Sequence, residues 1–254
     1  MNISGNTIFI PGSTSGIGWA LALRLHAKGN TVIVGGRRRE LLEQIAAEHP
    51  GLDTVQIDTA DSGSVRSAAE HVLKHHPDLN VVVAMAGIMQ MEDWHRPDTF
   101  LESAEAIINT NVLGLIRLIA AFIEHLQRRP DATIITVSSG LAFAPLKVTP
   151  SYNASKAAIH MLTESVRLQL ADTTVKVKEL VPPAVQTDLI PGQQESDWAV
   201  PLDEFADDVI RLLETEPDAN EIQVERVKFL RYGEARGDYD KVVATLNALD
   251  PHGN

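Results

Sequence analysis

The chain has 254 residues, which is long enough for one large domain or two small ones. Hydrophobic residues make up 44% and charged residues 22%, proportions of a globular protein that exclude disordered, collagen-like and coiled-coil chains. The 34 acidic side chains outnumber the 22 basic ones, and the net charge of −12 disfavours binding to nucleic acid or to anionic membranes. No cysteine is present, which excludes disulfides, thiolate catalysis and cysteine-based zinc sites.

Nothing at the N-terminus indicates export, because the chain enters an apolar run without a basic segment or a cleavage site. The most apolar long stretch, Leu113–Ile123, is interrupted by Arg117 and is shorter than the roughly 20 residues that span a bilayer. We therefore expect a cytoplasmic protein that does not contact membranes.

Short runs rich in β-branched residues alternate with longer helical patterns along the chain. Strands are expected at Thr7–Ile10, Thr31–Val34, Thr54–Ile57, Val81–Ala84, Thr133–Val137, Val175–Val181 and Ile222–Val224. Helices are expected at Gly16–Lys28, Leu41–Glu48, Ser64–Lys74, within Phe100–Gln127, at about Ser151–Leu170, and at Tyr239–Leu249. This alternation predicts an α/β protein with a three-layer Rossmann-type fold and a seven-stranded parallel sheet.

No linker, repeat or low-complexity tract divides the chain, so residues 1–254 are expected to form a single domain. Residues 184–200 lie in a stretch with little periodicity and several prolines, which we interpret as a long loop or substrate lid. Residues 226–254 are expected to form a C-terminal extension.

A glycine-rich turn follows the first expected strand and opens the first helix: Gly12, Ser13, Thr14, Ser15, Gly16, Ile17 and Gly18. Glycines let the backbone turn tightly and approach a pyrophosphate, while free N–H groups at the helix N-terminus attract the anion. The Gly-x-x-x-Gly-x-Gly spacing differs from the commoner Gly-x-Gly-x-x-Gly, and such turns also occur for structural reasons alone. A dinucleotide site at this turn is therefore a hypothesis that needs further support.

Three arginines, Arg37, Arg38 and Arg39, follow the second expected strand. In a dinucleotide-binding fold this position faces the adenosine ribose, where an acid favours NAD and an arginine accommodates the 2′-phosphate of NADP. Because no acid is present, the sequence favours NADP(H), with Arg37 as the first and Arg38 as the second phosphate ligand; NAD(H) stays open. The alternative is a solvated basic turn before the next helix.

Tyr152 and Lys156 are four residues apart in an expected helix, so their side chains share one face. A free phenol, with a pKa of about 10, is a poor base at neutral pH. A cation about 4 Å away, at an effective dielectric of about 20, lowers that pKa by up to roughly three units. Lys156 would then make Tyr152 an acid/base near pH 7, although the same spacing also occurs by chance. Ser139 lies at the carboxyl end of the fifth strand, where open α/β sheets bind ligands.

Together these features resemble the short-chain dehydrogenase/reductase (SDR) family over essentially the whole chain. The matching features, in chain order, are the glycine-rich turn, Asp58, Ala86-Gly87, Asn111, Ser139, Tyr152 with Lys156, and the segment from Pro183 to Thr187. The resemblance implies an NAD(P)-dependent oxidoreductase that interconverts an alcohol and a ketone or aldehyde by hydride transfer.

The resemblance also implies a role for each matching residue. Tyr152 would be the acid/base, Lys156 would lower its pKa and bind the nicotinamide ribose, and Ser139 would hydrogen-bond the substrate oxygen. Asn111 would hold a water molecule in a proton relay. Asp58 would contact the adenine, and the remaining implied cofactor contacts are Ala86, Gly87, Pro182, Val185 and Thr187.

The expected partners are a small carbonyl or alcohol substrate and further copies of the chain, in a homodimer or homotetramer formed through residues 100–127 and 151–170. No metal site is expected, because His71 and His75 have the spacing of a metal pair but lack a third ligand. The substrate pocket is expected to be lined by Met89, Leu141, Phe143, Leu189 and Trp198.

Three positions depart from the family pattern: Pro11 before the first glycine, Ala84-Met85 in place of an asparagine pair, and Ala184 after Pro183. The asparagine pair ties strands together, so its replacement puts sheet support near the cofactor in question. A second hypothesis is therefore a non-catalytic dinucleotide-binding regulatory or scaffold protein of the same fold. A third is an enzyme of this fold that performs dehydration or epimerisation.

Overall fold

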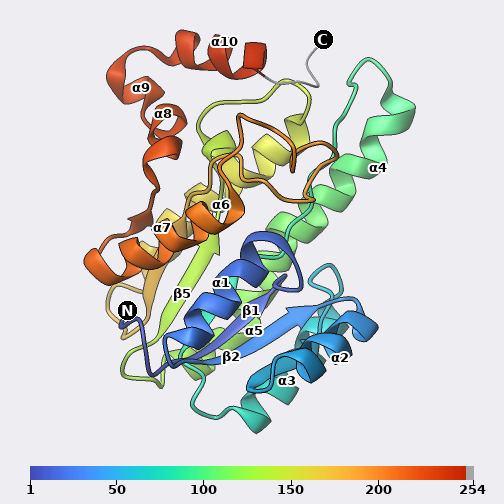
Figure 1. Ribbon diagram of the computed structural model, residues 1–254. Coiled ribbons are helices and arrows are strands. Elements are labelled where there is room, and N and C mark those ends of the chain that lie inside the picture. The colour runs from blue at the N-terminus through green and yellow to red at the C-terminus, as the bar shows by residue number, and fades with distance from the viewer. Residues whose placement is uncertain (250–254) are drawn as a thin grey trace.

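The structure, a computed structural model, describes residues 1–249 and has helices on both sides of a central sheet (Figure 1). Seven parallel strands pair in the order β3-β2-β1-β4-β5-β6-β7. They are β1 Thr7–Pro11, β2 Thr31–Gly36, β3 Leu52–Gln56, β4 Val81–Ala84, β5 Thr133–Val137, β6 Lys176–Leu180 and β7 Glu221–Ile222. The predicted Rossmann-type fold with a seven-stranded parallel sheet is confirmed, with β7 one residue shorter than expected and displaced toward the N-terminus.

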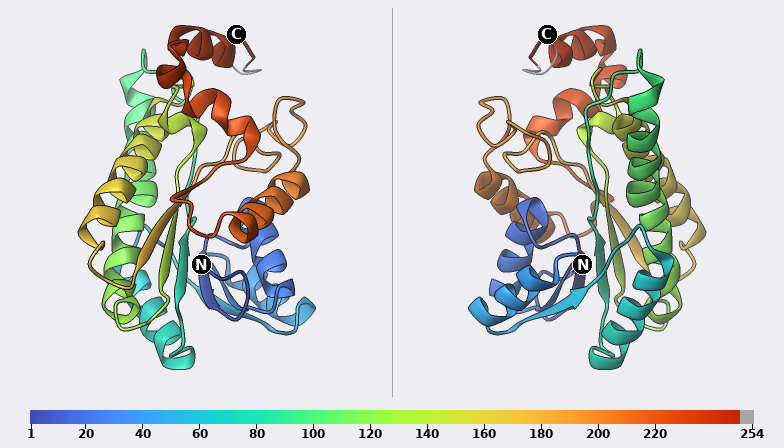
Figure 2. Two further views of the ribbon diagram at one scale, coloured as in Figure 1. Left: turned by 90° about the vertical axis from the view of Figure 1, so that its left-hand side faces the viewer. Right: turned by 90° about the vertical axis from the view of Figure 1, so that its right-hand side faces the viewer.

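Helices α1, α2 and α7 pack on one face of the sheet, and α3, α5 and α6 pack on the other (Figure 2). Three-residue 3-10 turns lie at Gly140–Ala142 and Glu225–Val227. The helices are α1 Gly16–Ala27, α2 Arg39–Glu48, α3 Ser62–His75, α4 Pro97–Ile107, α5 Gly114–Leu126, α6 Pro150–Gln169, α7 Leu202–Thr215, α8 Lys228–Arg231, α9 Gly233–Arg236 and α10 Tyr239–Leu249.

The core lies on both faces of the sheet, because the central strands are continuous apolar runs. On one face Phe9 of β1 meets Phe122 of α5 with ring centroids 5.5 Å apart, and both rings are fully buried. On the other face Phe205 of α7 is fully buried against the sheet. This two-sided burial fixes the strand ends at which the site is built.

The predicted helical zone within residues 100–127 is interrupted by one π-helical turn, Ile108–Leu113, which separates α4 from α5. By length and composition alone, Pro97–Leu126 is long and apolar enough to cross a membrane, a test that core helices also pass. In this fold Leu115, Leu118 and Phe122 of the stretch are buried against the sheet. The stretch therefore forms part of the helical layer on one face of the sheet.

Sheet pairing near the glycine-rich turn is unequal on the two sides of β1. Five residue pairs join β1 to β2, ending at Pro11 and Gly35, whereas only two pairs join β1 to β4. The backbone N–H groups of Gly12 and Ser13 then donate to the Gly35 carbonyl at 2.8 and 3.1 Å. Beside the altered Ala84-Met85 pair, β2 rather than β4 therefore holds the turn in place.

Two segments outside the sheet reach the edge where the strands end. Between β6 and α7 the described chain has no helix or strand, apart from an isolated bridge between Val185 and Val200. After β7, helices α8 to α10 return to the same end of the molecule (Figure 1). The sequence pattern predicts α10 with its observed bounds but not α8 or α9, which have four residues each. Residues 250–254 of the predicted extension lie outside the described residues.

Candidate active site

A large cavity, about 850 Å³ in volume, lies at the carboxyl ends of the parallel strands. This is the edge at which open α/β sheets bind ligands. Of the cofactor contacts expected from the sequence, the cavity is lined by Gly12, Thr14, Ser15, Gly16, Ile17, Gly18, Arg37, Arg38, Asp58, Ala86, Gly87, Tyr152, Lys156, Pro182, Val185 and Thr187.

Ser13 is the exception among the expected cofactor contacts. Its side chain is fully buried, and its hydroxyl donates to the Ile10 carbonyl at 2.5 Å. The prediction of a cofactor contact by Ser13 is therefore corrected. The Ser13 side chain points away from the cavity and binds the turn to β1, while its neighbours line the cavity.

The glycines of the turn are required by close backbone approaches. Gly12 has φ +86°, and a Cβ at this position would lie 2.7 Å from the Ala86 Cα. A Cβ on Gly18 would lie 2.5 Å from the Gly12 carbonyl oxygen. A side chain at either position would displace the backbone and fill the cradle at the N-terminus of α1. This geometry presents backbone N–H groups to an anion, as a pyrophosphate site requires.

The three arginines after β2 differ in their surroundings. Arg39 is paired with Glu43 of α2 at 2.9 Å, whereas Arg37 and Arg38 line the cavity. Arg38 Nη2 lies 3.4 Å from Thr14 Oγ1 of the glycine-rich turn. Within residues 1–249, neither Arg37 nor Arg38 pairs with a carboxylate, so both guanidinium groups are available to a phosphate. The glycine cradle, the cavity volume and these cations fit a nicotinamide dinucleotide.

Asp58 lies after β3 and lines the same cavity. Its Oδ1 accepts a hydrogen bond from the Ala60 N–H at 2.9 Å, and its own N–H donates to Ser64 Oγ at the same distance. These bonds fix the loop between β3 and α3, so that Asp58 is held at the cavity edge near Arg37 and Arg38.

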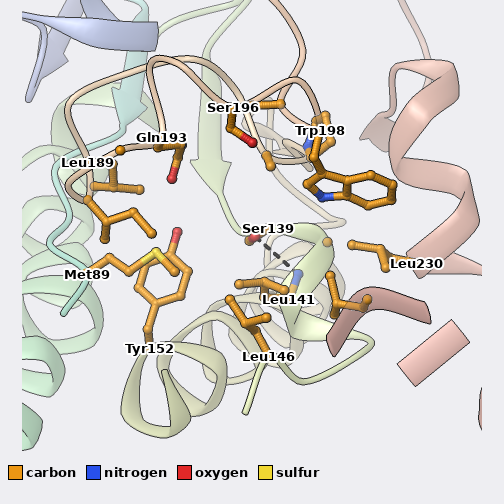
Figure 3. Close-up of a pocket in the computed structure, with 17 residues that line it drawn as sticks. Met89, Ser139, Leu141, Leu146, Tyr152, Leu189, Gln193, Ser196, Trp198 and Leu230 are labelled. Carbon is orange, nitrogen blue, oxygen red and sulfur yellow. Dashed lines mark hydrogen bonds between the residues drawn. The ribbon is translucent and has the colours of Figure 1, made fainter. Parts of the chain in front are cut away.

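Ser139 and Tyr152 lie where the large cavity meets a second, smaller one of about 110 Å³. Ser139 follows β5, and Tyr152 stands in the first turn of α6, whose N-terminus begins at Pro150. Figure 3 shows the Tyr152 hydroxyl pointing into the smaller cavity, beside Met89. A molecule bound in the smaller cavity would therefore meet both hydroxyls and the contents of the larger one.

Lys156 lies one helical turn after Tyr152, and its Nζ is 5.4 Å from the centre of the Tyr152 ring. The ammonium donates to the Val137 carbonyl at 2.8 Å. Burial lowers the pKa of Lys156 to about 8, and the carboxylate of Glu179 opposes this decrease. The group is therefore mainly protonated at neutral pH and close to losing its proton.

The pKa of Tyr152 is governed by burial, which raises it, while a hydrogen bond with Ser139 acts in the opposite direction. The expected lowering by Lys156 is not observed here, because desolvation of the phenolate has the larger effect. The geometry nevertheless places the hydroxyls of Tyr152 and Ser139 at the junction of the two cavities, with the Lys156 cation lining the larger one.

Asn111 lies inside the π-helical turn and is almost completely buried. Its Oδ1 accepts from the Ile88 N–H at 2.8 Å, and its Nδ2 lies 3.0 Å from both the Ile88 carbonyl and Ser155 Oγ. It does not line either cavity, so it is not in the position of a direct substrate or cofactor contact. Asn111 holds the segment after β4 that carries Gly87, next to Lys156, and its expected role in a proton relay stays a prediction.

The expected substrate-pocket residues divide into two groups. Met89, Leu141, Leu189 and Trp198 line the smaller cavity. Phe143 does not, and the prediction that it forms a pocket wall is wrong: its ring packs edge-on against His160 and under the Arg231 guanidinium. The helical turn at Gly140–Ala142 rotates Phe143 away from the cavity. Lining residues that sequence reasoning missed include Leu146, Leu230 and Leu246.

A buried carboxylate behind the site was also missed. Glu179 of β6 is fully buried and accepts a short hydrogen bond from the hydroxyl of Ser138, the neighbour of Ser139. His160 Nδ1 lies 2.9 Å from Glu179 Oε2, one turn after Lys156 along α6. Glu179 thus links the strand that carries Ser139 to the helix that carries Tyr152 and Lys156. The available signal was an acidic residue in an expected strand of the sheet, which also holds Lys176 and Lys178.

The comparisons with known proteins agree with this geometry. The model of the short chain dehydrogenase family matches residues 6–198. The chain is 36% identical to an uncharacterized oxidoreductase, DltE, of Bacillus subtilis (strain 168), over 98% of this chain and 100% of that protein. A crystal structure of a short chain dehydrogenase from Burkholderia cenocepacia J2315 in complex with NADP superposes with a TM-score of 0.82 at 27% identity, covering 97% of this chain and 99% of that one.

A third similar protein is an alcohol dehydrogenase from the archaeon Thermococcus sibiricus, whose structure is complexed with 5-hydroxy-NADP. It has a TM-score of 0.77 at 26% identity, covering 87% of this chain and 96% of that one. With the family model covering most of the chain, this chain belongs to the short-chain dehydrogenase family and is an oxidoreductase that uses a nicotinamide dinucleotide.

Proposed function

We propose that the protein interconverts an alcohol and a ketone or aldehyde, preferring NADP(H) to NAD(H), with Tyr152 as the acid/base. The observation that carries this proposal is the position of Tyr152 and Ser139, which line both the dinucleotide-sized cavity and the smaller cavity. A carbonyl oxygen held by both hydroxyls has its carbon directed toward the larger cavity.

The proposed chemistry follows from charge development at that oxygen. The nicotinamide, when bound, supplies the hydride in reduction and accepts it in oxidation. As the carbonyl oxygen becomes negative, Ser139 donates a hydrogen bond and Tyr152 transfers its phenolic proton to it. The Lys156 ammonium, held by the Val137 carbonyl, then stabilises the phenolate of Tyr152. Alcohol oxidation runs the same steps in reverse.

The proposed NADPH preference rests on Arg37 and Arg38, which face the cavity while Arg39 is paired with Glu43. A charge-assisted hydrogen bond to a phosphate contributes about 1.5 to 3 kcal/mol, or roughly ten- to hundredfold in affinity. A 2′-hydroxyl, as in NADH, offers no such charge.

Titration of the purified protein with NADPH and NADH, followed by nicotinamide fluorescence at low and high salt, tests this preference. We expect tight, salt-sensitive NADPH binding and weaker NADH binding. Arg37→Ala should weaken NADPH binding about tenfold or more without changing NADH binding, and Arg39→Ala is the matched control. Equal losses for both cofactors would refute the phosphate contact, and binding of neither would overturn the proposed function.

Turnover separates the proposed reaction from its two alternatives. Tyr152→Phe should still bind NADPH but lose about 100- to 10,000-fold in kcat, the usual contribution of acid/base catalysis. A non-catalytic regulatory protein would show no substrate-dependent NADPH consumption in either form. A dehydratase or epimerase would convert its substrate without stoichiometric NADPH oxidation. Measuring NADPH consumed against alcohol formed distinguishes these outcomes.

The proposed assembly is a homodimer or homotetramer in the cytoplasm, with residues 1–254 as one domain and 184–200 acting as a substrate lid. The π-helical turn, α5 and α6 lie on the same face of the sheet (Figure 2). Support for assembly comes from exposed apolar side chains on these elements, which are Leu113 of the turn, Ile116 of α5, and Met161 and Leu168 of α6. Light scattering should give a multiple of the 27.7 kDa chain mass, and Met161→Glu should shift it toward the monomer.

A further inference from the structure

We infer that the substrate is an uncharged ketone or secondary alcohol whose non-reacting part is a hydrocarbon chain or ring. This inference rests on the proposed carbonyl chemistry and concerns the smaller cavity, which opens beside Ser139 and Tyr152.

The lining of the smaller cavity carries no charge. None of its seventeen residues, all within the described part of the chain, has an acidic or basic side chain (Figure 3). The larger cavity, in contrast, is lined by five charged residues: Arg37, Arg38, Asp58, Lys156 and Asp188. A carboxylate, phosphate or ammonium in the smaller cavity would lose its hydration without meeting an opposite charge. The site therefore selects against charged substrates.

Hydrogen-bonding side chains are also few. Besides the two reactive hydroxyls, the polar side chains of the described lining are those of Gln193, Ser196 and Trp198. Gln193 Nε2 already donates to the Val185 carbonyl at 2.5 Å, which ties it to its own loop. A sugar or polyol would bury several hydroxyls with too few partners here. An apolar substrate body leaves no such groups unsatisfied.

One wall is formed by Trp198 at the end of the loop before α7. The Arg226 guanidinium lies 4.7 Å from the centre of the Trp198 ring, and Arg226 Nη2 donates to the Trp198 carbonyl at 3.1 Å. The guanidinium lies over the indole ring, and Arg226 is not one of the residues that line the cavity. In Figure 3 Trp198 and Leu230 lie on the opposite side of the cavity from Leu189 and Tyr152.

A further part of the lining comes from the C-terminal helices. Leu230 of α8 packs so closely on the turn after Ser139 that a Cβ on Gly140 would lie 2.6 Å from its Cδ1. Leu246 of α10 is positioned by its neighbour Asn247, which accepts from the Lys147 N–H at 2.7 Å and donates to the Pro145 carbonyl at 3.0 Å. Both leucines are buried and line the cavity. Their surface suits aliphatic or aromatic groups.

The test compares matched methyl ketones with the full-length protein and NADPH. The series is 2-pentanone, 2-heptanone and 6-oxoheptanoate, of which the last has a carboxylate where 2-heptanone has its terminal methyl group. Each buried methylene should raise kcat/KM by about three- to fourfold, so 2-heptanone should exceed 2-pentanone by about tenfold. The carboxylate should be at least about 100-fold poorer than 2-heptanone, because its charge is unpaired.

Two leucine variants link this preference to the cavity walls. Leu230→Ala and Leu246→Ala should each reduce the advantage of 2-heptanone over 2-pentanone in kcat/KM. Leu41→Ala is the matched control, because Leu41 is only partly buried on α2 and lines neither cavity. If all three variants lose activity and melt at a lower temperature, the substitutions have unfolded the protein. The kcat/KM values of the native protein for the three ketones then test the inference by themselves.

A readout independent of turnover separates the substrate class from the reaction. The chain has three tryptophans, so replacing Trp19 and Trp94 by Phe leaves Trp198 as the reporter of the cavity. A change in Trp198 fluorescence with 2-heptanone but not with 6-oxoheptanoate supports the inference even if NADPH is not consumed. Reduction of 6-oxoheptanoate as fast as 2-heptanone overturns it while leaving the proposed function intact. Absence of both a fluorescence change and turnover with 2-heptanone also overturns it.

Discussion

The close approach of the glycine-rich turn to the end of β4 gives a sharp prediction. Gly12→Ala places a methyl group where the Cβ would lie 2.7 Å from the Ala86 Cα and 2.8 Å from its nitrogen, in a backbone with φ +86°. Gly5→Ala imposes a similar strain, at φ +76°, but in open space with no atom within 4 Å. The pair of variants therefore separates backbone strain from steric displacement.

The expected loss of stability has two sources, the strained backbone conformation and the steric overlap with Ala86. The left-handed conformation costs an alanine about 1 to 2 kcal/mol, which both variants incur. In Gly12→Ala the turn and Ala86 must also move apart by about 0.7 Å to reach ordinary contact, and overpacking of this kind costs about 1 to 3 kcal/mol more. A displacement of that size in a positioned site weakens function by roughly ten- to hundredfold.

Thermal unfolding and NADPH titration measure both effects. Gly5→Ala should lower Tm by about 2 to 4 °C for each kcal/mol lost and leave the Kd for NADPH unchanged. Gly12→Ala should lower Tm further and raise the Kd at least about tenfold. If the two variants had the same Kd and the same Tm, the argument that Gly12 is needed for close approach to Ala86 would be refuted.

Three further changes test the buried parts of the site and the core. Lys156→Met should stabilise the protein at pH 7 by up to about 3 kcal/mol while abolishing turnover, because the pKa of Lys156 falls from 10.5 to about 8 on folding. Between pH 8 and pH 10.5 Lys156 holds a proton in the unfolded chain but not in the folded one, so the stability of the native protein rises with pH. The stability gain of Lys156→Met over the native protein should therefore vanish above about pH 10.5. Urea unfolding at several pH values would measure this change. Glu179→Gln removes the carboxylate that supports the protonated Lys156, and the basic limb of the pH profile of kcat/KM should move to lower pH; Glu124→Gln, an exposed change of equal charge, should not move it. Phe122→Ala should destabilise the fold by about 3 to 5 kcal/mol in urea unfolding, and a loss below 1 kcal/mol would contradict its place in the core.

The parts of the fold that could be predicted are those with a local signal. Strands β1, β2, β4 and β5 are buried on both faces, so each is a mainly apolar run that stands out between the helices. Tyr152 and Lys156 are predictable partners because helical periodicity alone places them on one face. Arg37 and Arg38 follow a strand directly, and strand ends point to the ligand edge in this class of fold.

The parts that could not be predicted depend on contacts between distant segments. No local pattern indicates that Leu230 lies against Gly140, or that Leu246 reaches the cavity through the anchoring of Asn247. Phe143 follows Ser139 closely, yet a single 3-10 turn directs it to Arg231 instead of the cavity. Glu179 can be recognised in the sequence as an acidic residue within an expected strand. Its contact with His160 could not be predicted, because it depends on how α6 packs against β6.

The two cavities draw on different parts of the chain, with consequences for how such an enzyme diversifies. Every residue that lines the larger cavity comes from the first 193 positions, whereas the smaller one needs α8 and α10 to complete its wall. A ribosome-bound or truncated chain that ends before α8 would already contain the dinucleotide cradle and the reactive hydroxyls without a finished specificity wall. Under the proposed function, replacing the C-terminal helices would change which substrates are accepted without altering any residue that lines the dinucleotide-sized cavity.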